Sequence, residues 1–179
     1  MKKILITGAA GFIAPHIIEE SLKRNWEVVA VDLKEVAENL KYKDVKYLKK
    51  DVRNLDKDDL KDLDFIAHLA FITNIPNSIK YPIETTYDNI DMSAILLKKA
   101  EEANVKKVIF SSTASLYGNN PIPWVEGMQA DPIEPYSWQK LSCEYLFKMW
   151  HERYGLKTST VRLYQVYGEN QRADTALAK

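Results

Sequence analysis

The sequence predicts an α/β protein built on a doubly wound parallel sheet. Short runs rich in β-branched residues alternate along the chain with longer helical stretches. This alternation is typical of βαβ units, whose crossover helices cover both faces of one sheet. A glycine-containing turn at residues 8–14 directly follows the first run. Such a turn between a first strand and a first helix suits the same architecture.

The individual elements are expected in a regular order. Strands are expected at residues 3–7, 27–32, 46–49, 64–70, 107–112 and 158–163. Helices are expected at residues 12–25, in a short piece near 55–60, at 82–103 and at 136–154. The stretch 118–135 holds four prolines and two glycines, which predicts a loop. Loops of this length are often lids or binding loops, and this one lies where a substrate would enter.

Composition indicates one domain in a chain of 179 residues. The 25 basic and 25 acidic side chains cancel, so no nucleic-acid or membrane partner is expected. Cys143 is the only cysteine, which rules out an internal disulfide and favours the cytoplasm. His16, His68 and His151 lack metal-ligand spacing, so no metal site is expected. For His68 we expect a structural role at the end of the fourth strand.

The turn after the first strand has the features of a phosphate site. A dinucleotide pyrophosphate needs backbone N–H donors at a helix N-terminus and no side chain in its way. Gly8 permits the tight turn and Gly11 permits close approach, while Ala14 stands where a third glycine is common. The alternative is a strand–helix turn that binds no ligand.

Asp32 ends the second strand, where a carboxylate can accept hydrogen bonds from the adenosine ribose. It would repel a 2′-phosphate, so it favours NAD over NADP, although Lys34 lies nearby. A carboxylate that merely caps the strand end is the alternative. Asp51 and Val52 follow the third strand and are expected to contact the adenine.

Thr113, Tyr136 and Lys140 form a candidate acid/base site. Tyr136 and Lys140 are four residues apart, so both side chains lie on one face of a helix. A free tyrosine has a pKa of about 10, and a nearby cation favours the phenolate. We therefore expect Lys140 to lower the pKa of Tyr136, and Thr113 to hold the reacting oxygen. Because the spacing also arises by chance, a solvated helix pair is the alternative.

The helix expected at 136–154 is apolar on two sides. One stripe is Trp138, Leu141, Tyr145 and Met149, and the other is Cys143, Phe147, Trp150 and Tyr154. A helix of this kind is covered on both sides. One side would pack on the sheet; the other would pack on a second subunit or beneath a loop.

Taken together, these pieces resemble an extended short-chain dehydrogenase/reductase of the NAD-dependent epimerase/dehydratase family. The resemblance covers almost the whole chain in the family's order. It is carried by TGAAGFI at 7–13, Asp32, DVR at 51–53, HLA at 68–70, Asn89, SSTASLYG at 111–118, YSWQK at 136–140 and RLYQVYG at 162–168.

The resemblance implies a Rossmann fold, NAD as cofactor and a nucleotide sugar as substrate. It implies that Thr113 is the catalytic Ser/Thr, Tyr136 the base, Lys140 its partner and Asn89 the support of the lysine, through water. It also implies a homodimer formed by the helices that carry Asn89 and Tyr136. The implied cofactor contacts are Gly8, Ala10, Gly11, Phe12, Ile13, Asp32, Asp51, Val52, Leu69, Ala70, Asn89, Ser111, Tyr136 and Lys140. The implied substrate contacts are Thr113, Tyr136 and Gln165.

Three departures from the family pattern refine the hypothesis. Ala114 and Ser115 replace the acidic residues that dehydrating members carry, which favours epimerisation or ketone reduction. Gln165 replaces a common asparagine that helps bind the substrate diphosphate. Family members are longer, so residues 1–179 are interpreted as an NAD-binding Rossmann domain, apparently truncated, with the C-terminal substrate lobe absent.

The sequence thus predicts NAD-dependent epimerisation, or ketone/alcohol redox, of a nucleotide sugar. The alternatives are a non-catalytic NAD-binding regulator or scaffold, and an inactive fragment of the enzyme. The intact Thr113, Tyr136 and Lys140 argue against a regulator, which has no need of all three.

Overall fold

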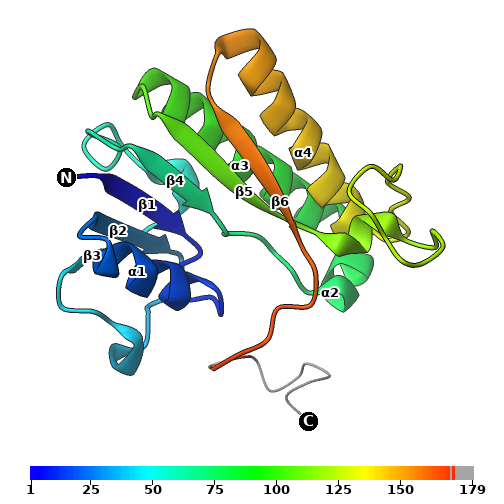
Figure 1. Ribbon diagram of the computed structural model, residues 1–179, viewed down its shortest axis with the longest axis horizontal. Coiled ribbons are helices and arrows are strands. Elements are labelled where there is room, and N and C mark those ends of the chain that lie inside the picture. Colours follow the sequence, from blue (N-terminus) through cyan, green and yellow to red (C-terminus); the bar gives the residue numbers. More distant parts are fainter. Residues whose placement is uncertain (170, 172–179) are drawn as a thin grey trace.

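The computed structural model describes residues 1–169 and 171, and it has a six-stranded parallel sheet (Figure 1). The strand order is β3-β2-β1-β4-β5-β6. The strands are β1 (Lys3–Thr7), β2 (Glu27–Asp32), β3 (Val45–Lys49), β4 (Phe65–His68), β5 (Lys107–Thr113) and β6 (Thr158–Leu163). The predicted α/β class and doubly wound parallel sheet are confirmed.

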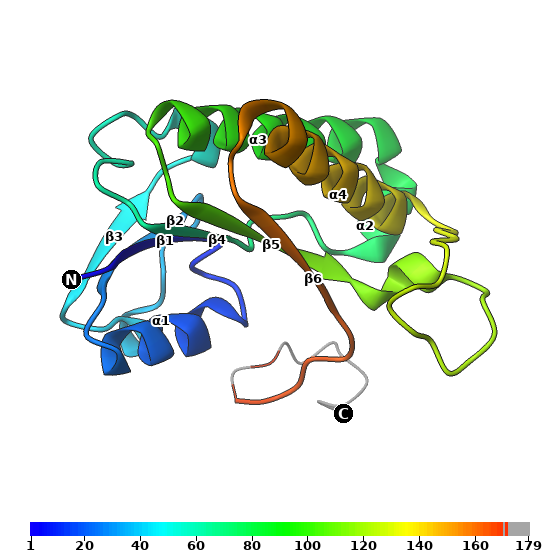
Figure 2. The same cartoon turned by 45° about the horizontal axis from the view of Figure 1, so that its top comes forward.

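The described part of the chain has four α-helices, in two layers. They are α1 (Ala14–Lys23), α2 (Ile75–Lys80), α3 (Pro82–Glu102) and α4 (Pro135–Tyr154). Figure 2 shows α3 and α4 on one face of the sheet and α1 on the other. None of the described helices is long and apolar enough to cross a membrane.

The alternation of side chains along β1 divides the core into two layers. Leu5 joins the cluster on the side of α3 and α4, which includes Phe110 and Phe147. Ile4 and Ile6 join the cluster on the side of α1. Because successive strand residues point to opposite faces, an uninterrupted apolar strand serves both layers.

The strand order reverses between β1 and β4, and this reversal creates the site. β1 pairs with β2 on one side and with β4 on the other, so that Thr7 aligns with both Val31 and His68. The crossover helices leave in opposite directions from this point. A crevice therefore opens beyond the carboxyl ends of these strands, where ligands bind in open α/β sheets.

The prediction of a short helix near residues 55–60 is wrong. Those residues form turns, and the helical piece lies earlier, as a 3₁₀ turn at Val52–Asn54. The side chains of Asp56 and Asp59 each accept a hydrogen bond from the other's backbone N–H. Both carboxylates also bind Lys50, with N–O distances of 2.8 Å and 2.5 Å. Such local side-chain bonds compete with helix formation.

The sequence analysis missed α2. The clearest local signal for this helix is its N-cap residue, Asn74. Asn74 accepts a hydrogen bond from the Asn77 backbone N–H at 2.8 Å, and Pro76 lies in the first turn. Both residues are favoured at these positions. The six-residue helix is too short to show a hydrophobic period.

A buried polar chain ties the end of β1 to the end of β4 and to α3. The Thr7 hydroxyl oxygen accepts the backbone N–H groups of Leu69 and Ala70, at 3.1 and 3.0 Å. It therefore donates its own hydrogen to His68 Nδ1, 2.8 Å away, and His68 Nε2 donates to the Ser93 hydroxyl at 3.1 Å. Burial lowers the pKa of His68 to about 3, so the ring is neutral at pH 7. These contacts fit the structural role expected for His68.

We predict that Gly8→Ala destabilises the fold more than Gly155→Ala. Both glycines have positive φ, +74° and +73°, so alanine costs about 1–2 kcal/mol at either position. A Cβ at Gly8 would also lie 2.8 Å from the Ala70 backbone nitrogen, whereas Gly155 has open space. The clash should bring the loss at Gly8 to about 2–4 kcal/mol, measured as the free energy of unfolding in urea. Equal losses would contradict the proposed packing.

Candidate active site

One cleft of about 750 Å³ opens at the carboxyl ends of the central strands. It is lined by every residue expected to contact cofactor and by Thr113, whereas Gln165 is exposed and not among the lining residues. The predicted residues that it brings together are Gly8, Ala10, Gly11, Phe12, Ile13, Asp32, Asp51, Val52, Leu69, Ala70, Asn89, Ser111, Thr113, Tyr136 and Lys140.

The glycine turn leaves the N-terminus of α1 open to the cleft. The Gly11 backbone N–H donates to the Gly8 carbonyl at 2.9 Å, which closes the turn. Ile13 precedes α1 without a side-chain cap, and no acidic residue lies in the first turn. Uncapped N–H groups and the helix dipole attract an anion there. Because a Cβ at Gly8 would strike Ala70, only glycine keeps this cradle, and the geometry fits a pyrophosphate.

Asp32 is held across the turn from the end of β2. One carboxylate oxygen accepts the Ala10 backbone N–H at 3.0 Å and the other accepts that of Lys34 at 2.8 Å. The Asp32 side chain lines the cleft beside Asp51 and Val52. A bound adenosine would therefore meet a fixed carboxylate near its ribose.

The sequence analysis did not assign Arg53, which also lines the cleft. Its guanidinium binds the Asp51 carboxylate at 2.8 Å and Asp88 of α3 at 3.0 Å. The hydrogen bonds from Arg53 lower the pKa of Asp51 and keep this carboxylate ionised. The one-residue spacing between Asp51 and Arg53 was the available signal.

The candidate acid/base residues meet at the other end of the cleft. Thr113 is the last residue of β5, and Tyr136 lies in the first turn of α4. The Thr113 hydroxyl oxygen accepts the Ser115 backbone N–H at 3.1 Å, and Thr113 and Tyr136 both line the cleft. Glu134 caps α4 by accepting the Ser137 backbone N–H at 3.0 Å, which fixes the turn that carries Tyr136.

Lys140 is almost fully buried one helical turn after Tyr136. Its ammonium donates to the Ser111 carbonyl at 2.6 Å and lies 5.9 Å from the centre of the Tyr136 ring. Two other rings are closer, with centroids at 3.7 Å for Phe71 and 4.7 Å for Phe110. Burial lowers the pKa of Lys140 to about 7, because the charged form loses its hydration.

The expected lowering of the Tyr136 pKa is absent in this arrangement. Burial raises the pKa of Tyr136 above its ordinary value; the Thr113 hydrogen bond opposes the rise, and the Glu134 charge adds to it. The Lys140 ammonium, 5.9 Å from the centre of the Tyr136 ring, binds the Ser111 carbonyl, and it does not offset the effect of burial on the Tyr136 pKa. The protein's own groups therefore favour the neutral phenol.

Among the described residues, no hydrogen bond joins Asn89 to Lys140. The Asn89 side-chain oxygen accepts the Ile72 backbone N–H at 2.7 Å, and its amide nitrogen donates to Gln139 Oε1 at 2.8 Å and to the Ile72 carbonyl at 3.3 Å. Gln139, unassigned from sequence, is fully buried between α3 and α4. Its amide nitrogen also binds the hydroxyls of Thr85 and Thr86, at 3.1 Å and 2.9 Å.

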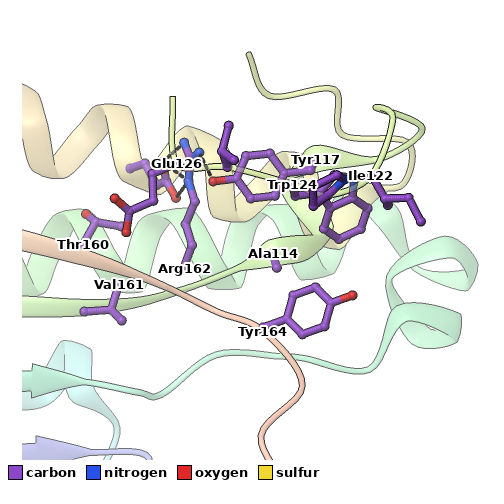
Figure 3. A pocket seen from close by; sticks show the side chains of 12 residues that line it. Ala114, Tyr117, Ile122, Trp124, Glu126, Thr160, Val161, Arg162 and Tyr164 are labelled. Carbon is purple, nitrogen blue, oxygen red and sulfur yellow. Dashed lines mark hydrogen bonds and ion pairs between the residues drawn. The ribbon is translucent and has the colours of Figure 1, made fainter. Parts of the chain in front are cut away.

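A second hollow of about 1130 Å³ lies beside β6 and contains Trp124 (Figure 3). The Trp124 indole N–H donates to the Asn120 carbonyl at 3.0 Å, and its ring packs on Tyr117 and Tyr164. Of the two roles considered for Trp124, these contacts support pinning of the loop. Arg162 crosses the hollow, bound to Glu144 at 2.8 Å.

Sequence comparison identifies the class of protein. A model of the NAD-dependent epimerase/dehydratase family matches residues 4–179. The chain belongs to this family, which uses NAD, and the cleft described above has the glycine cradle and fixed carboxylate that NAD needs.

The similar proteins are largely nucleotide-sugar epimerases. A UDP-glucose 4-epimerase of Halalkalibacterium halodurans is 34% identical over 92% of this chain and 51% of its own length. Among solved structures, the UDP-N-acetylglucosamine 4-epimerase of Methanobrevibacter ruminantium is 34% identical with a TM-score of 0.90, over 99% of this chain and 59% of that one. The UDP-glucuronic acid 4-epimerase of Bacillus cereus, in complex with UDP-glucuronic acid and NAD, is 30% identical with a TM-score of 0.90, over 98% and 60%. The chain thus spans about half the length of the relatives it matches.

We predict that Lys140→Met stabilises the protein at pH 7 and that this advantage shrinks as pH rises. The pKa of Lys140 falls from about 10.5 in the unfolded chain to about 7 when folded. The unfolded state therefore holds more protons between these values, and wild-type stability rises with pH there, by up to about 1.4 kcal/mol per unit. Methionine removes this dependence. Urea unfolding from pH 7 to pH 10 measures it.

The matched control is Lys148→Met, on the same helix, because the Lys148 side chain is mostly exposed. Its stability should follow the wild-type pH dependence. If Lys140→Met also follows the wild type, the ammonium of Lys140 is not buried in solution.

Proposed function

We propose that residues 1–179 are the NAD-binding domain of an enzyme that epimerises a nucleotide sugar, or interconverts its alcohol and ketone. One observation carries the proposal: a single cleft contains the phosphate-type cradle at Gly8, the carboxylate of Asp32, and the Thr113, Tyr136 and Lys140 cluster. A cofactor spanning the cleft would bring its reactive ring beside Tyr136. The nucleotide-sugar epimerases among the relatives support the substrate class.

The chain offers a set of contacts along the length of the cofactor. In this proposal the backbone N–H groups at Phe12 and Ile13 bind the pyrophosphate, and Asp32 binds the adenosine ribose. When bound in its oxidised form, NAD supplies a hydride acceptor and a positive charge. Lys140 lines the cleft, and in this proposal it holds the second ribose.

Tyr136 is the proposed proton acceptor for the substrate hydroxyl. Its neutral form is favoured by burial, so a positive charge brought beside it acts in a dry site and favours the phenolate. Thr113, which lines the same cleft as Tyr136, would orient the same hydroxyl. Ala114 and Ser115 follow Thr113 without a carboxylate, which favours epimerisation or redox over elimination of water.

We predict that Tyr136→Phe lowers turnover by about 10²–10⁴-fold while NAD affinity changes little, because only the transferable proton is lost. Turnover is measured by chromatography over a panel of UDP-sugars, and NAD affinity by calorimetry. Tyr154→Phe, an exposed change on the same helix, is the control and should keep full activity.

Three outcomes of that experiment would contradict the proposal in different ways. Retained turnover in Tyr136→Phe would remove the tyrosine from the mechanism. Wild-type protein that fails to bind NAD would overturn the whole function. NAD binding without turnover of any UDP-sugar would favour the regulator, scaffold or fragment alternatives.

The proposal includes a homodimer formed by α3 and α4. Cys143 and Phe147, on one apolar stripe of α4, are buried in the core, which agrees with packing on the sheet, whereas Tyr154 at the end of that stripe is exposed. The exposed large apolar side chains on the two helices are Ile83 (80% exposed), Tyr87 (67%), Trp138 (51%), Tyr145 (65%) and, at the end of α4, Tyr154 (55%). Large apolar groups clustered on adjacent helices are typical of protein–protein interfaces.

We predict that Tyr87→Asp or Tyr145→Asp converts a dimer into a monomer, because each change leaves a desolvated charge in the interface. Light scattering after size-exclusion chromatography measures the mass. Ile122→Asp is the control, since Ile122 is exposed and belongs to the loop at 118–134 rather than to either helix. A wild-type monomer, or dimers in both interface variants, would refute this interface.

A further inference from the structure

The ammonium of Lys140 lies against two aromatic rings of different character. Phe110 belongs to β5 and is fully buried in the core. Phe71, in the connection after β4, is only partly buried and lines the cleft. Phe71 is also the nearer ring, with its centroid 3.7 Å from Lys140 Nζ against 4.7 Å for Phe110.

The lysine charge has little other support. Among the residues that the structure describes, the hydrogen bond of Lys140 Nζ goes to the Ser111 carbonyl. An ammonium has three donors, so two of them are left without a hydrogen-bond acceptor there. A cation over a ring face at short distance is attracted by the ring quadrupole, most strongly when water is excluded.

The ionisable neighbours of Lys140 do not provide a direct counter-ion. Cys143 and Glu144 on α4 act on the Lys140 pKa in the upward direction, but burial outweighs both. The Glu144 carboxylate is bound to Arg162 of β6. His68 of β4 is neutral, and residues 69–74 carry no ionisable side chain.

The other groups near Lys140, on α4, α3 and β5, also provide no direct counter-ion. Tyr136, on the same helix, is favoured in its neutral form. On α3, Asp88 and Asp91 face Arg53, with N–O distances of 3.0 Å and 3.6 Å. At β5, Ser111 presents a carbonyl and Thr113 a hydroxyl.

The Phe71 ring is held in place from both sides. Asn89 clamps the next residue, Ile72, by two hydrogen bonds to its backbone N–H and carbonyl. Gln139 in turn fixes the Asn89 amide. On its other side the Phe71 ring meets Tyr136 edge to face, with centroids 6.0 Å apart at 76°. This clamp gives the ring one orientation toward the ammonium.

We propose that Phe71 is a positioning residue for Lys140: its ring face holds the ammonium against the Ser111 carbonyl and stabilises the positive charge there. The significance for catalysis rests on the function proposed above, in which a charged Lys140 holds the cofactor ribose. The effect on the lysine itself needs no cofactor. Asn89 then supports the lysine through Ile72 and Phe71.

The test is the titration of Lys140 in Phe71 variants of the 179-residue chain. Lysine labelled with ¹³C at Cε reports the ammonium by NMR, and the Lys140 signal is assigned by its loss in Lys140→Met. Phe71→Leu and Phe71→Met remove the π face but keep an apolar side chain. Phe71→Tyr keeps the face and is the matched control.

We expect the pKa of Lys140 to fall by about one unit in Phe71→Leu and Phe71→Met, and to stay unchanged in Phe71→Tyr. A pKa that is unchanged or raised in both aliphatic variants would overturn the proposal, since burial alone would then account for the lysine. If the Phe71→Leu variant does not fold because leucine packs poorly, the Phe71→Met variant provides the same test. A purely structural role for Phe71 would lower stability without this difference.

A second measurement separates this inference from the proposed function. NAD affinity, followed by calorimetry from pH 6 to pH 9, should weaken on the alkaline side as Lys140 loses its proton. In Phe71→Leu that weakening should begin at a lower pH. No NAD binding by wild-type protein would refute the proposed function, while the NMR titration would still decide the role of Phe71.

Discussion

The site depends on how firmly the end of β1 is joined to the end of β4. The Thr7 hydroxyl makes this joint, because it accepts two backbone N–H groups from the chain after β4 and donates to His68. The glycine turn then packs directly on that chain, with no space for a Cβ at Gly8. Since the strand order reverses between these two strands, any movement of the end of β1 relative to the end of β4 would change the width of the cleft. Buried and fully paired polar groups of this kind hold a single arrangement.

A second constraint is the dryness of the cleft floor. Lys140 and Asn89 line the cleft, Gln139 binds Asn89, and all three are almost completely buried yet make specific hydrogen bonds. Burial shifts Lys140 toward its neutral form and keeps Tyr136 protonated. A site in this condition responds strongly to any charge that a ligand brings, because the interaction is little screened. The chain's own groups thus prepare the site, and the charge of a bound cofactor would complete it.

The two faces of α4 connect this chemistry to assembly. The buried face carries Lys140 and Gln139 toward the sheet and α3, while Trp138 and Tyr145 remain exposed. In the proposed dimer, the helix that carries the acid/base pair also forms the subunit contact. The chain spans 51% of the length of one curated relative and 59% of one solved structure that it matches.

The sequence alone determined the strands and long helices, because apolar periodicity and β-branched runs are local properties. It also identified the glycine turn, Asp32, and the Tyr136–Lys140 spacing, since each motif is short and its chemistry is tied to residue type. It failed at 55–60, where Asp56 and Asp59 bond to each other's backbone, and at α2, which is too short to show a period.

Only the tertiary structure decided the environment of these residues. Phe71 lies against Lys140, and Gln139 binds Asn89, through contacts between segments far apart in sequence that no local pattern encodes. The tertiary structure also decided that burial raises the pKa of Tyr136 and lowers the pKa of Lys140. Spacing places a cation one turn from a phenol, but desolvation and the position of the ammonium depend on everything packed around them, and these opposed the expected shift.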